Sequence, residues 1–213
     1  MILPYLKDRP QSLHRHVDGW QGKEFWQRIS RTQPPWVRTA RVNNRKGERT
    51  WNLTQDWPTL LWLVNFGCIE FLPWCSRVET LDWPDYAVID LDPQDVAFNQ
   101  VVEVAQAIHR LLDKIGADNY CKTSGKRGLH VCVPLGAKYL HSHARMFADI
   151  VAMLIQRQFP GITTLSPARQ GLIYLDCTRN TRGQSIAAPY CVRSWRGATV
   201  STPLKWSEVP TRA

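Results

Sequence analysis

The sequence lacks the marks of a membrane-spanning or exported protein. Its apolar runs are short and interrupted by charges, and none reaches the roughly 18 residues that a membrane span needs. The N-terminus, MILPYLKDRP, has neither a long apolar core nor a small-residue cleavage site, so it does not resemble a signal peptide. We therefore expect a cytoplasmic protein without a membrane partner.

The cysteines lack the spacing of a metal site. No CxxC pair occurs among them, which argues against a zinc ribbon and against a thioredoxin-type redox site. Because export signals are missing, a disulfide framework is also unexpected in a chain of 213 residues. We expect reduced thiols, mostly in the core, at Cys68, Cys75, Cys121, Cys132, Cys177 and Cys191.

Repeats and low-complexity segments are missing as well. What is present is an apolar content of 44%, which suits a globular protein, and a formal net charge of +9. Excess positive charge attracts polyanions, nucleic acid first, through counterion release, although a solvated basic surface without a partner is the alternative. The ten tryptophans favour nucleic acid, because aromatic faces beside Arg and Lys suit stacking on bases.

Residues 1–56 form a basic, aromatic N-terminal part, and residues 57–213 form the catalytic core of what we expect to be a single domain. In the first part, the alternation in WVRTAR, followed by the turn residues NNRKGE, predicts a hairpin. Asp56 is placed to cap a helix that runs from about residue 58 to residue 67.

Strands and helices alternate in the remainder of the chain. YAVIDLD predicts a strand, and Asp95 opens a helix that ends at Gly116. LHVCVPL predicts a second strand, a helix around Ile150 follows, GLIYLDC predicts a third strand, and SIAAPYCVRSW predicts a fourth. The order shows neither a doubly wound pattern nor a glycine-rich nucleotide fingerprint. We predict an α/β (α+β) fold with a mixed sheet.

Asp90 and Asp92 lie in the first of these strands, where an ionised carboxylate is costly unless a cation or several donors meet it. Strand alternation puts both on one face, with Cα atoms roughly 6–7 Å apart, and Pro93 ends the strand directly after them. GLIYLDC brings Asp176 to a second strand end. Three such carboxylates predict a two-metal Mg²⁺ or Mn²⁺ site for phosphoryl or nucleotidyl transfer, and solvated acids at exposed strand ends are the alternative.

Cationic segments flank these carboxylates. In KTSGKRGLHVCVPL, Ser124 and two glycines permit a tight loop whose amides can approach a phosphate, Lys122 adds charge, and His130 could donate to a triphosphate oxygen. A plain turn with a polar histidine explains this segment equally well. Arg179, Arg182 and Arg193 follow Asp176, and arginine suits fork-like contact with phosphate, unless these residues lie on a solvated loop.

Together these segments resemble the polymerase domain of bacterial ligase D, a branch of the archaeo-eukaryotic primase superfamily. The resemblance rests on YAVIDLDP, KTSGKRGLHVCVPL, YLDCTRNTRGQSIAAPYCVRS and VSTPLKW, with weaker similarity in LPYLKDRPQSLHRHVDGWQGKEFWQR. It covers nearly the whole chain, and the ordered set is far more specific than any single motif.

The resemblance implies a primase-like core in which Asp90, Asp92 and Asp176 are metal-binding catalytic residues. It implies a template-dependent nucleotidyltransferase that adds nucleotides, often ribonucleotides, to DNA ends in non-homologous end joining, with Mn²⁺ favoured and with Ku and a ligase as partners. We expect the NTP or dNTP to contact Ser124, His130, Lys122, Arg179 and Arg193, and DNA to contact Arg15, Arg28, Arg38 and Arg41.

The chain departs from the family pattern at three places. The resemblance implies a few dozen residues ahead of LPYLKDRP that contact a recessed 5′-phosphate. This sequence begins about there, so the sequence leaves open whether recognition of the 5′-phosphate is kept. Leu72 of EFLPW replaces the histidine of the family's EIHPW, and leucine can neither donate nor titrate. Arg28 replaces the lysine of FFQK, which keeps the charge but changes the contact geometry.

Two other functions fit the same residues. One is a catalytically weak DNA-binding or accessory protein derived from such a polymerase, which the short N-terminus and Leu72 suggest. The other is a primase that starts chains without a primer, which sequence alone does not separate from a polymerase.

Overall fold

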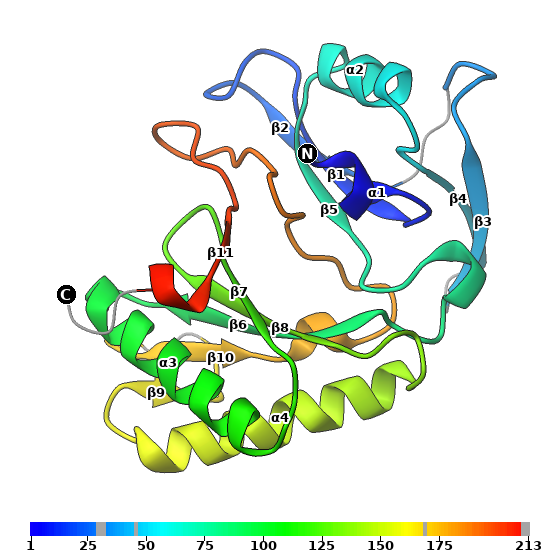
Figure 1. The fold of residues 1–213 in the computed structure, drawn as a ribbon. Coiled ribbons are helices and arrows are strands. Elements are labelled where there is room, and N and C mark those ends of the chain that lie inside the picture. Colours follow the sequence, from blue (N-terminus) through cyan, green and yellow to red (C-terminus); the bar gives the residue numbers. More distant parts are fainter. Residues whose placement is uncertain (29–32, 45–46, 168–169, 210–213) are drawn as a thin grey trace.

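A six-stranded sheet forms the centre of the computed structural model, which describes residues 1–28, 33–44, 47–167 and 170–209 (Figure 1). Strand β9 runs parallel to β10, and the other neighbours are antiparallel, so the sheet is mixed, as predicted. The strands follow in the order β11 (Pro203–Leu204), β7 (Tyr120–Thr123), β8 (Leu129–Pro134), β6 (Tyr86–Pro93), β10 (Ile173–Asp176) and β9 (Thr163–Thr164).

Helices α3 (Phe98–Lys114) and α4 (His141–Gln158) cover one face of this sheet (Figure 1). Ile89 and Leu91 of β6 belong to that covered face, and both are buried in the main hydrophobic core. Burying such a side chain contributes about 1.5–3 kcal/mol. Because strand side chains alternate, this core fixes Asp90 and Asp92 on the opposite face, which the helices leave open.

A second, three-stranded sheet lies across from that open face (Figure 1). Its central strand β1 (Gln11–His16) pairs antiparallel with β2 (Glu24–Gln27) and with β5 (Cys68–Pro73). Helix α2 (Trp57–Asn65) and the short helix α1 (Leu3–Leu6) contribute to the apolar cluster of this sheet. As predicted, Asp56 caps α2, because its carboxylate accepts a hydrogen bond of 2.8 Å from the amide of Thr59.

The predicted hairpin near residue 40 is confirmed. Strands β3 (Thr39–Asn44) and β4 (Gly47–Asn52) pair antiparallel, and Trp51 of β4 packs edge-on against Trp74. Residues 45–46 of the turn lie outside the described residues. The remaining elements are single 3₁₀ turns, namely η1 (Val78–Thr80), η2 (Thr178–Asn180) and η3 (Trp206–Glu208).

Two local predictions were wrong. Helix α3 begins at Phe98 with Ala97 as its N-cap, whereas Asp95 has a φ of 57° and forms part of the preceding turn. The predicted fourth strand, SIAAPYCVRSW, has only isolated bridges, because Tyr190 directly after Pro189 takes a φ of 63°, which interrupts an extended ladder.

All six cysteines are free, and five of them are buried, in agreement with the expected reduced core thiols. Within the described part of the chain, no helix is long and apolar enough to cross a membrane.

Candidate active site

Four polar residues form a row across four neighbouring strands on the open face of the six-stranded sheet. Lys122 of β7 pairs with His130 of β8, and His130 pairs with Asp90 of β6. Asp90 pairs in turn with Asp176 of β10. Because residues paired across strands project to the same face, the register brings three separate sequence segments into one acidic and cationic line, which we call the polar row.

Asp92 lies one step further along β6, opposite Tyr174. Burial raises the pKa of Asp92, and repulsion from Asp90 and from Asp176 adds to this rise. The side-chain amide of Gln94 donates a hydrogen bond of 3.0 Å from Nε2 to Oδ2 of Asp92. The environment therefore resists the charged form of Asp92, and an added cation would relieve that resistance.

His130 holds one end of the Asp90 carboxylate. Its Nδ1 lies 2.7 Å from the Nζ atom of Lys122, and its Nε2 lies 3.3 Å from Oδ1 of Asp90. Burial, with the charge of Lys122, lowers the pKa of His130 to about 4. The neutral imidazole accepts from the lysine at Nδ1 and donates to the aspartate at Nε2.

Lys122 and Asp90, the charged residues on either side of His130, both have shifted pKa values. Burial lowers the pKa of Lys122 to about 8, and its Nζ donates a further hydrogen bond of 2.8 Å to the hydroxyl of Ser201. Burial would raise the pKa of Asp90, but His130, Arg179 and Lys122 together hold it below its ordinary value. Asp90 is thus the ionised anchor of the row.

Asp176 is held by the 3₁₀ turn that follows it. Its Oδ1 accepts hydrogen bonds from the amide, at 2.7 Å, and from the hydroxyl of Thr178. Its Oδ2 lies 3.3 Å from Nε of Arg179. Asn180, at the end of the same turn, exchanges two hydrogen bonds of 2.7 Å with the backbone of Val88 and so ties the turn to β6.

The loop between β7 and β8 is held by hydrogen bonds to the side chain of Ser124. The hydroxyl of Ser124 accepts from the amides of Lys126, at 3.1 Å, and of Gly128, at 3.0 Å. These two amides are therefore used within the loop. Gly128 packs so closely on β6 that an added Cβ would lie 2.0 Å from the carbonyl oxygen of Leu91. The loop is seated directly beside the aspartates.

A buried acid that sequence reasoning missed joins the two sheets. Glu70 of β5 is fully buried, its Oε1 accepts from the amide and hydroxyl of Ser194, and its Oε2 lies 3.2 Å from Nε of Arg193. Arg193 also donates to the carbonyl oxygen of Ser124. Burial opposes the charge of Glu70, but Arg193, Ser194 and Lys126 outweigh it and lower the pKa. A signal existed, since an acid within the apolar CIEFLP is as costly as one in YAVIDLD.

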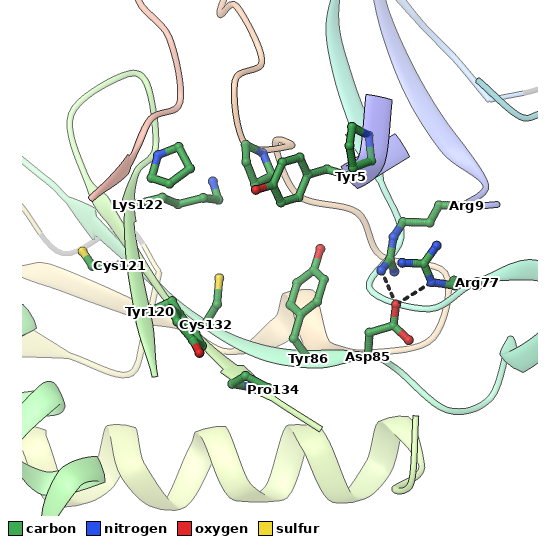
Figure 2. Close-up of a pocket in the computed structure, with 13 residues that line it drawn as sticks. Tyr5, Arg9, Arg77, Asp85, Tyr86, Tyr120, Cys121, Lys122, Cys132 and Pro134 are labelled. Atoms are coloured by element: carbon green, nitrogen blue, oxygen red, sulfur yellow. Dashed lines mark hydrogen bonds and ion pairs between the residues drawn. The ribbon is translucent and has the colours of Figure 1, made fainter. Parts of the chain in front are cut away.

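Two hollows lie near opposite ends of β6, and one of them is lined by a residue of the polar row, Lys122. The first, of ≈ 410 Å³, lies at the Pro93 end of β6. It is lined by the cations Lys126 and Arg127, by the acid Asp95, and by Pro93, Val96 and Phe98. The other, of ≈ 490 Å³, lies at the Tyr86 end and borders Lys122. Figure 2 shows its wall, where Asp85 faces the guanidinium groups of Arg9 and Arg77, alongside Tyr5, Tyr86 and Cys132.

The arginines expected to contact DNA lie on the N-terminal part. Arg15 of β1 stacks on the ring of Phe66 and donates to the carbonyl oxygen of that residue, and Arg28 is exposed just after β2. Arg38 and Arg41 are exposed and pair with acids of the N-terminal part. Within the described residues, the contacts of Arg15, Arg38 and Arg41 do not reach the three aspartates.

Two further residues lie apart from the row. Leu72 is half-buried on β5 opposite Ser12, and alternation puts it on the same face as Glu70. Arg182, which the sequence grouped with the phosphate-facing arginines, pairs instead with Asp82 at 2.6 Å and donates to the carbonyl oxygen of Asn43.

The three aspartates supply only oxygen ligands, the type that Mg²⁺ and Mn²⁺ prefer. Among the described residues, their oxygens are less closely gathered than the ligand atoms of His14, His16 and Glu24 on the other sheet. Burial raises the pKa of Asp92, repulsion from Asp90 and Asp176 adds to this rise, and a bound cation would offset both. The donor set and its repulsion both fit a pair of hard divalent cations.

Comparison with known proteins identifies close relatives. The family model of the LigD primase-polymerase domain matches residues 1–213. The multifunctional non-homologous end joining protein LigD of Pseudomonas aeruginosa is 32% identical over 209 residues, which is 96% of this chain and 25% of the relative. The bifunctional non-homologous end joining protein LigD of Bacillus subtilis is 30% identical over 213 residues, which is 98% of this chain and 34% of the relative.

A solved structure gives the same result. The polymerase domain of Mycobacterium tuberculosis ligase D in complex with DNA superposes with a TM-score of 0.90 at 27% identity, covering 98% of this chain and 77% of that one. The chain spans about a quarter to a third of the length of the curated relatives it matches.

Proposed function

The chain belongs to the LigD primase-polymerase domain family, and on that premise we propose that it is a template-directed nucleotidyltransferase that extends DNA ends in double-strand break repair. In the proposed reaction, the 3′-hydroxyl oxygen of a DNA end bonds to the α-phosphorus of a nucleoside triphosphate. The bond to the β-phosphate breaks, and pyrophosphate leaves.

The observation that carries the proposal is the polar row with Asp92 beside it. Asp90, Asp92 and Asp176 project from two paired strands onto an open face, between a cationic loop and Arg179. A structural role would not need three carboxylates at a place where burial, and then their mutual repulsion, raises the pKa of one of them. Substrate phosphates and cations together would balance this charge.

The three aspartates would hold Mg²⁺ or Mn²⁺, which supply charge neutralisation at the transferred phosphate and activation of the attacking hydroxyl. The other residues position groups around that centre. His130, neutral and wedged between Lys122 and Asp90, fixes the Asp90 carboxylate in one orientation. Arg179 keeps its side chain partly exposed beside Asp176, where it can turn toward a phosphate oxygen.

The loop beside the aspartates is suited to the triphosphate. Lys126 and Arg127 line the hollow at the Pro93 end, and Ser124 retains its hydroxyl hydrogen as a donor because its oxygen accepts the loop amides. Arg193 holds the loop from behind through the Ser124 carbonyl. We assign Lys126 and Arg127 to direct contact with the phosphates, and Arg193 to positioning the loop.

DNA is the proposed macromolecular partner. The net charge of +9, the exposed Arg28, Arg38 and Arg41, and a solved relative in complex with DNA support this. We extend the proposal to Ku and to a ligase, because the curated relatives are non-homologous end joining proteins.

Primer extension tests the proposal directly. Purified protein is given a primer–template, Mn²⁺ or Mg²⁺, and NTPs or dNTPs, and we expect templated addition that is lost in Asp90→Asn. Salt-sensitive DNA binding without incorporation by the folded wild-type chain would instead support the accessory-protein alternative. Synthesis on a bare template without primer would identify a primase.

A further inference from the structure

Three potential metal ligands converge on the other sheet, far along the sequence from the aspartates. His14 and His16 are two residues apart on β1 and therefore lie on the same face of the sheet. Glu24 of β2 pairs directly with His16 in the antiparallel register. Their ligand atoms all lie within 4.8 Å of one another. Both imidazoles are more than nine-tenths buried, while the side chain of Glu24 is 58% exposed. We call this group the histidine cluster.

Two of the three separations between ligand atoms in the cluster match a tetrahedral ion. Nε2 of His14 lies 3.1 Å, and Nε2 of His16 lies 3.6 Å, from the same oxygen, Oε2 of Glu24. Ligands bound at about 2.0–2.1 Å to a tetrahedral zinc ion are separated by about 3.3 Å. The observed separations bracket that value, so small side-chain movements would complete the geometry.

Both histidines carry buried ring nitrogens without a hydrogen-bond partner among the described residues. These are Nε2 of His14 and both ring nitrogens of His16. Both Nε2 atoms face the Glu24 carboxylate without a hydrogen bond to it. Leaving a buried nitrogen without a hydrogen bond costs about 1–3 kcal/mol, which an unfilled ligand site explains.

The contacts of His14 determine which of its ring nitrogens carries the proton. The hydroxyl of Ser194 donates its hydrogen to Glu70, so its oxygen accepts from Nδ1 of His14, 3.2 Å away. With the proton on Nδ1, Nε2 presents its lone pair toward Glu24. Trp26 stacks on the ring at 4.2 Å with an interplanar angle of 4° and holds its plane.

We propose that His14, His16 and Glu24 bind a Zn²⁺ ion, with water in the fourth position on the exposed side. Two imidazoles and one carboxylate suit a cation of borderline softness, whereas the all-oxygen aspartates suit Mg²⁺ or Mn²⁺. The ion clamps β2 onto β1, and His14 connects it through Ser194 and Glu70 to the sheet-joining contacts of Arg193.

Zinc binding to the untagged chain, stripped with a chelator and exchanged into clean buffer, tests the site. Competition with a chromophoric chelator measures the zinc affinity, and the absorption of bound Co²⁺ reports four-coordinate geometry. Asp90→Asn serves as the background, so that binding at the aspartates is weakened. We expect one tightly bound equivalent and a tetrahedral Co²⁺ spectrum.

Glu24→Gln and His16→Asn should each weaken zinc binding by more than about tenfold, a loss seen even for residues that only support ligands. His143→Asn, an exposed histidine on α4, is the matched control and should bind as the parent does. Glu24 is exposed, so its variant keeps the test valid if His16→Asn fails to fold. Absence of a tight equivalent, or equal affinity in Glu24→Gln and the parent, would overturn the proposal. The assay contains neither DNA nor nucleotide, so its result is independent of polymerase activity.

Discussion

The two facing sheets each carry a strand-borne cluster of potential metal ligands, and the clusters differ in how far they are assembled. The histidine cluster combines two imidazoles with one carboxylate, and its ligand atoms already converge. The three aspartates repel one another and stay further apart, with Asp92 disfavoured in its charged form. Two imidazoles beside a single carboxylate do not repel one another, so they can converge without an ion. Three carboxylates repel one another unless a cation lies between them.

Removing charge from the aspartates is the most direct way to break this comparison. Asp92→Asn should lower nucleotide addition by about a thousandfold, because a bound metal contributes several kcal/mol to the transition state. The fold should be unaffected, since burial and the neighbouring aspartates both disfavour the charged carboxylate of Asp92. Primer extension and thermal unfolding measure the two effects, with Glu103→Gln on the exposed face of α3 as the control. An Asp92→Asn protein with full activity would remove the metal-site argument.

The contact between the sheets is the next most sensitive point. Glu70→Gln leaves Arg193 buried without its charged partner, so we expect unfolding free energy to fall by about 3–5 kcal/mol. Urea denaturation measures this. Glu103→Gln again serves as the control and should change stability by less than about 0.5 kcal/mol. If the Glu70 variant matched that control, the two sheets would not depend on this contact.

The close contact between Gly128, in the loop between β7 and β8, and strand β6 should have a smaller effect on stability when it is disturbed. In Gly128→Ala the new methyl group meets the Leu91 carbonyl oxygen, and forcing the loop off β6 should cost about 1–3 kcal/mol and weaken triphosphate binding. Gly161→Ala adds a methyl group where nothing lies within 4 Å and should change neither property. Unfolding curves and the KM for NTP report the outcome, and parity between the two variants would contradict the close packing.

The smallest effect is expected where this chain departs from the family motif. Leu72 lies on β5 outside the polar row, so Leu72→His should change the rate of nucleotide addition by less than about tenfold. Steady-state kinetics with Mn²⁺ test this. A gain much larger than that would mean that the row is incomplete without an imidazole at position 72.

Alternation along single strands was enough to predict much of the site. It put Asp90 and Asp92 on one face and marked Asp176 as their partner from another strand. It did not predict that Lys122, His130, Asp90 and Asp176 form one line, because the register between strands is set by long-range packing and not by local sequence.

The same limit explains what sequence reasoning missed. Glu70 interrupts an apolar strand as plainly as Asp90 does, but its partners Arg193 and Ser194 come from a segment that was expected to be a strand. In LHRH, the resemblance points to Arg15, whereas His14 and His16 have the two-residue spacing that puts both on one face of a strand. Their partner Glu24 follows only from the β1–β2 register.

Diffraction from crystals soaked with Mn²⁺ and a non-hydrolysable nucleoside triphosphate tests the central claim most directly, because manganese is located by its anomalous signal. We predict manganese between Asp90, Asp92 and Asp176, with the carboxylates drawn closer than they are without ions and the triphosphate against Lys126 and Arg127. Nucleotide bound elsewhere, or manganese found at His14, His16 and Glu24 but not at the aspartates, would contradict the account.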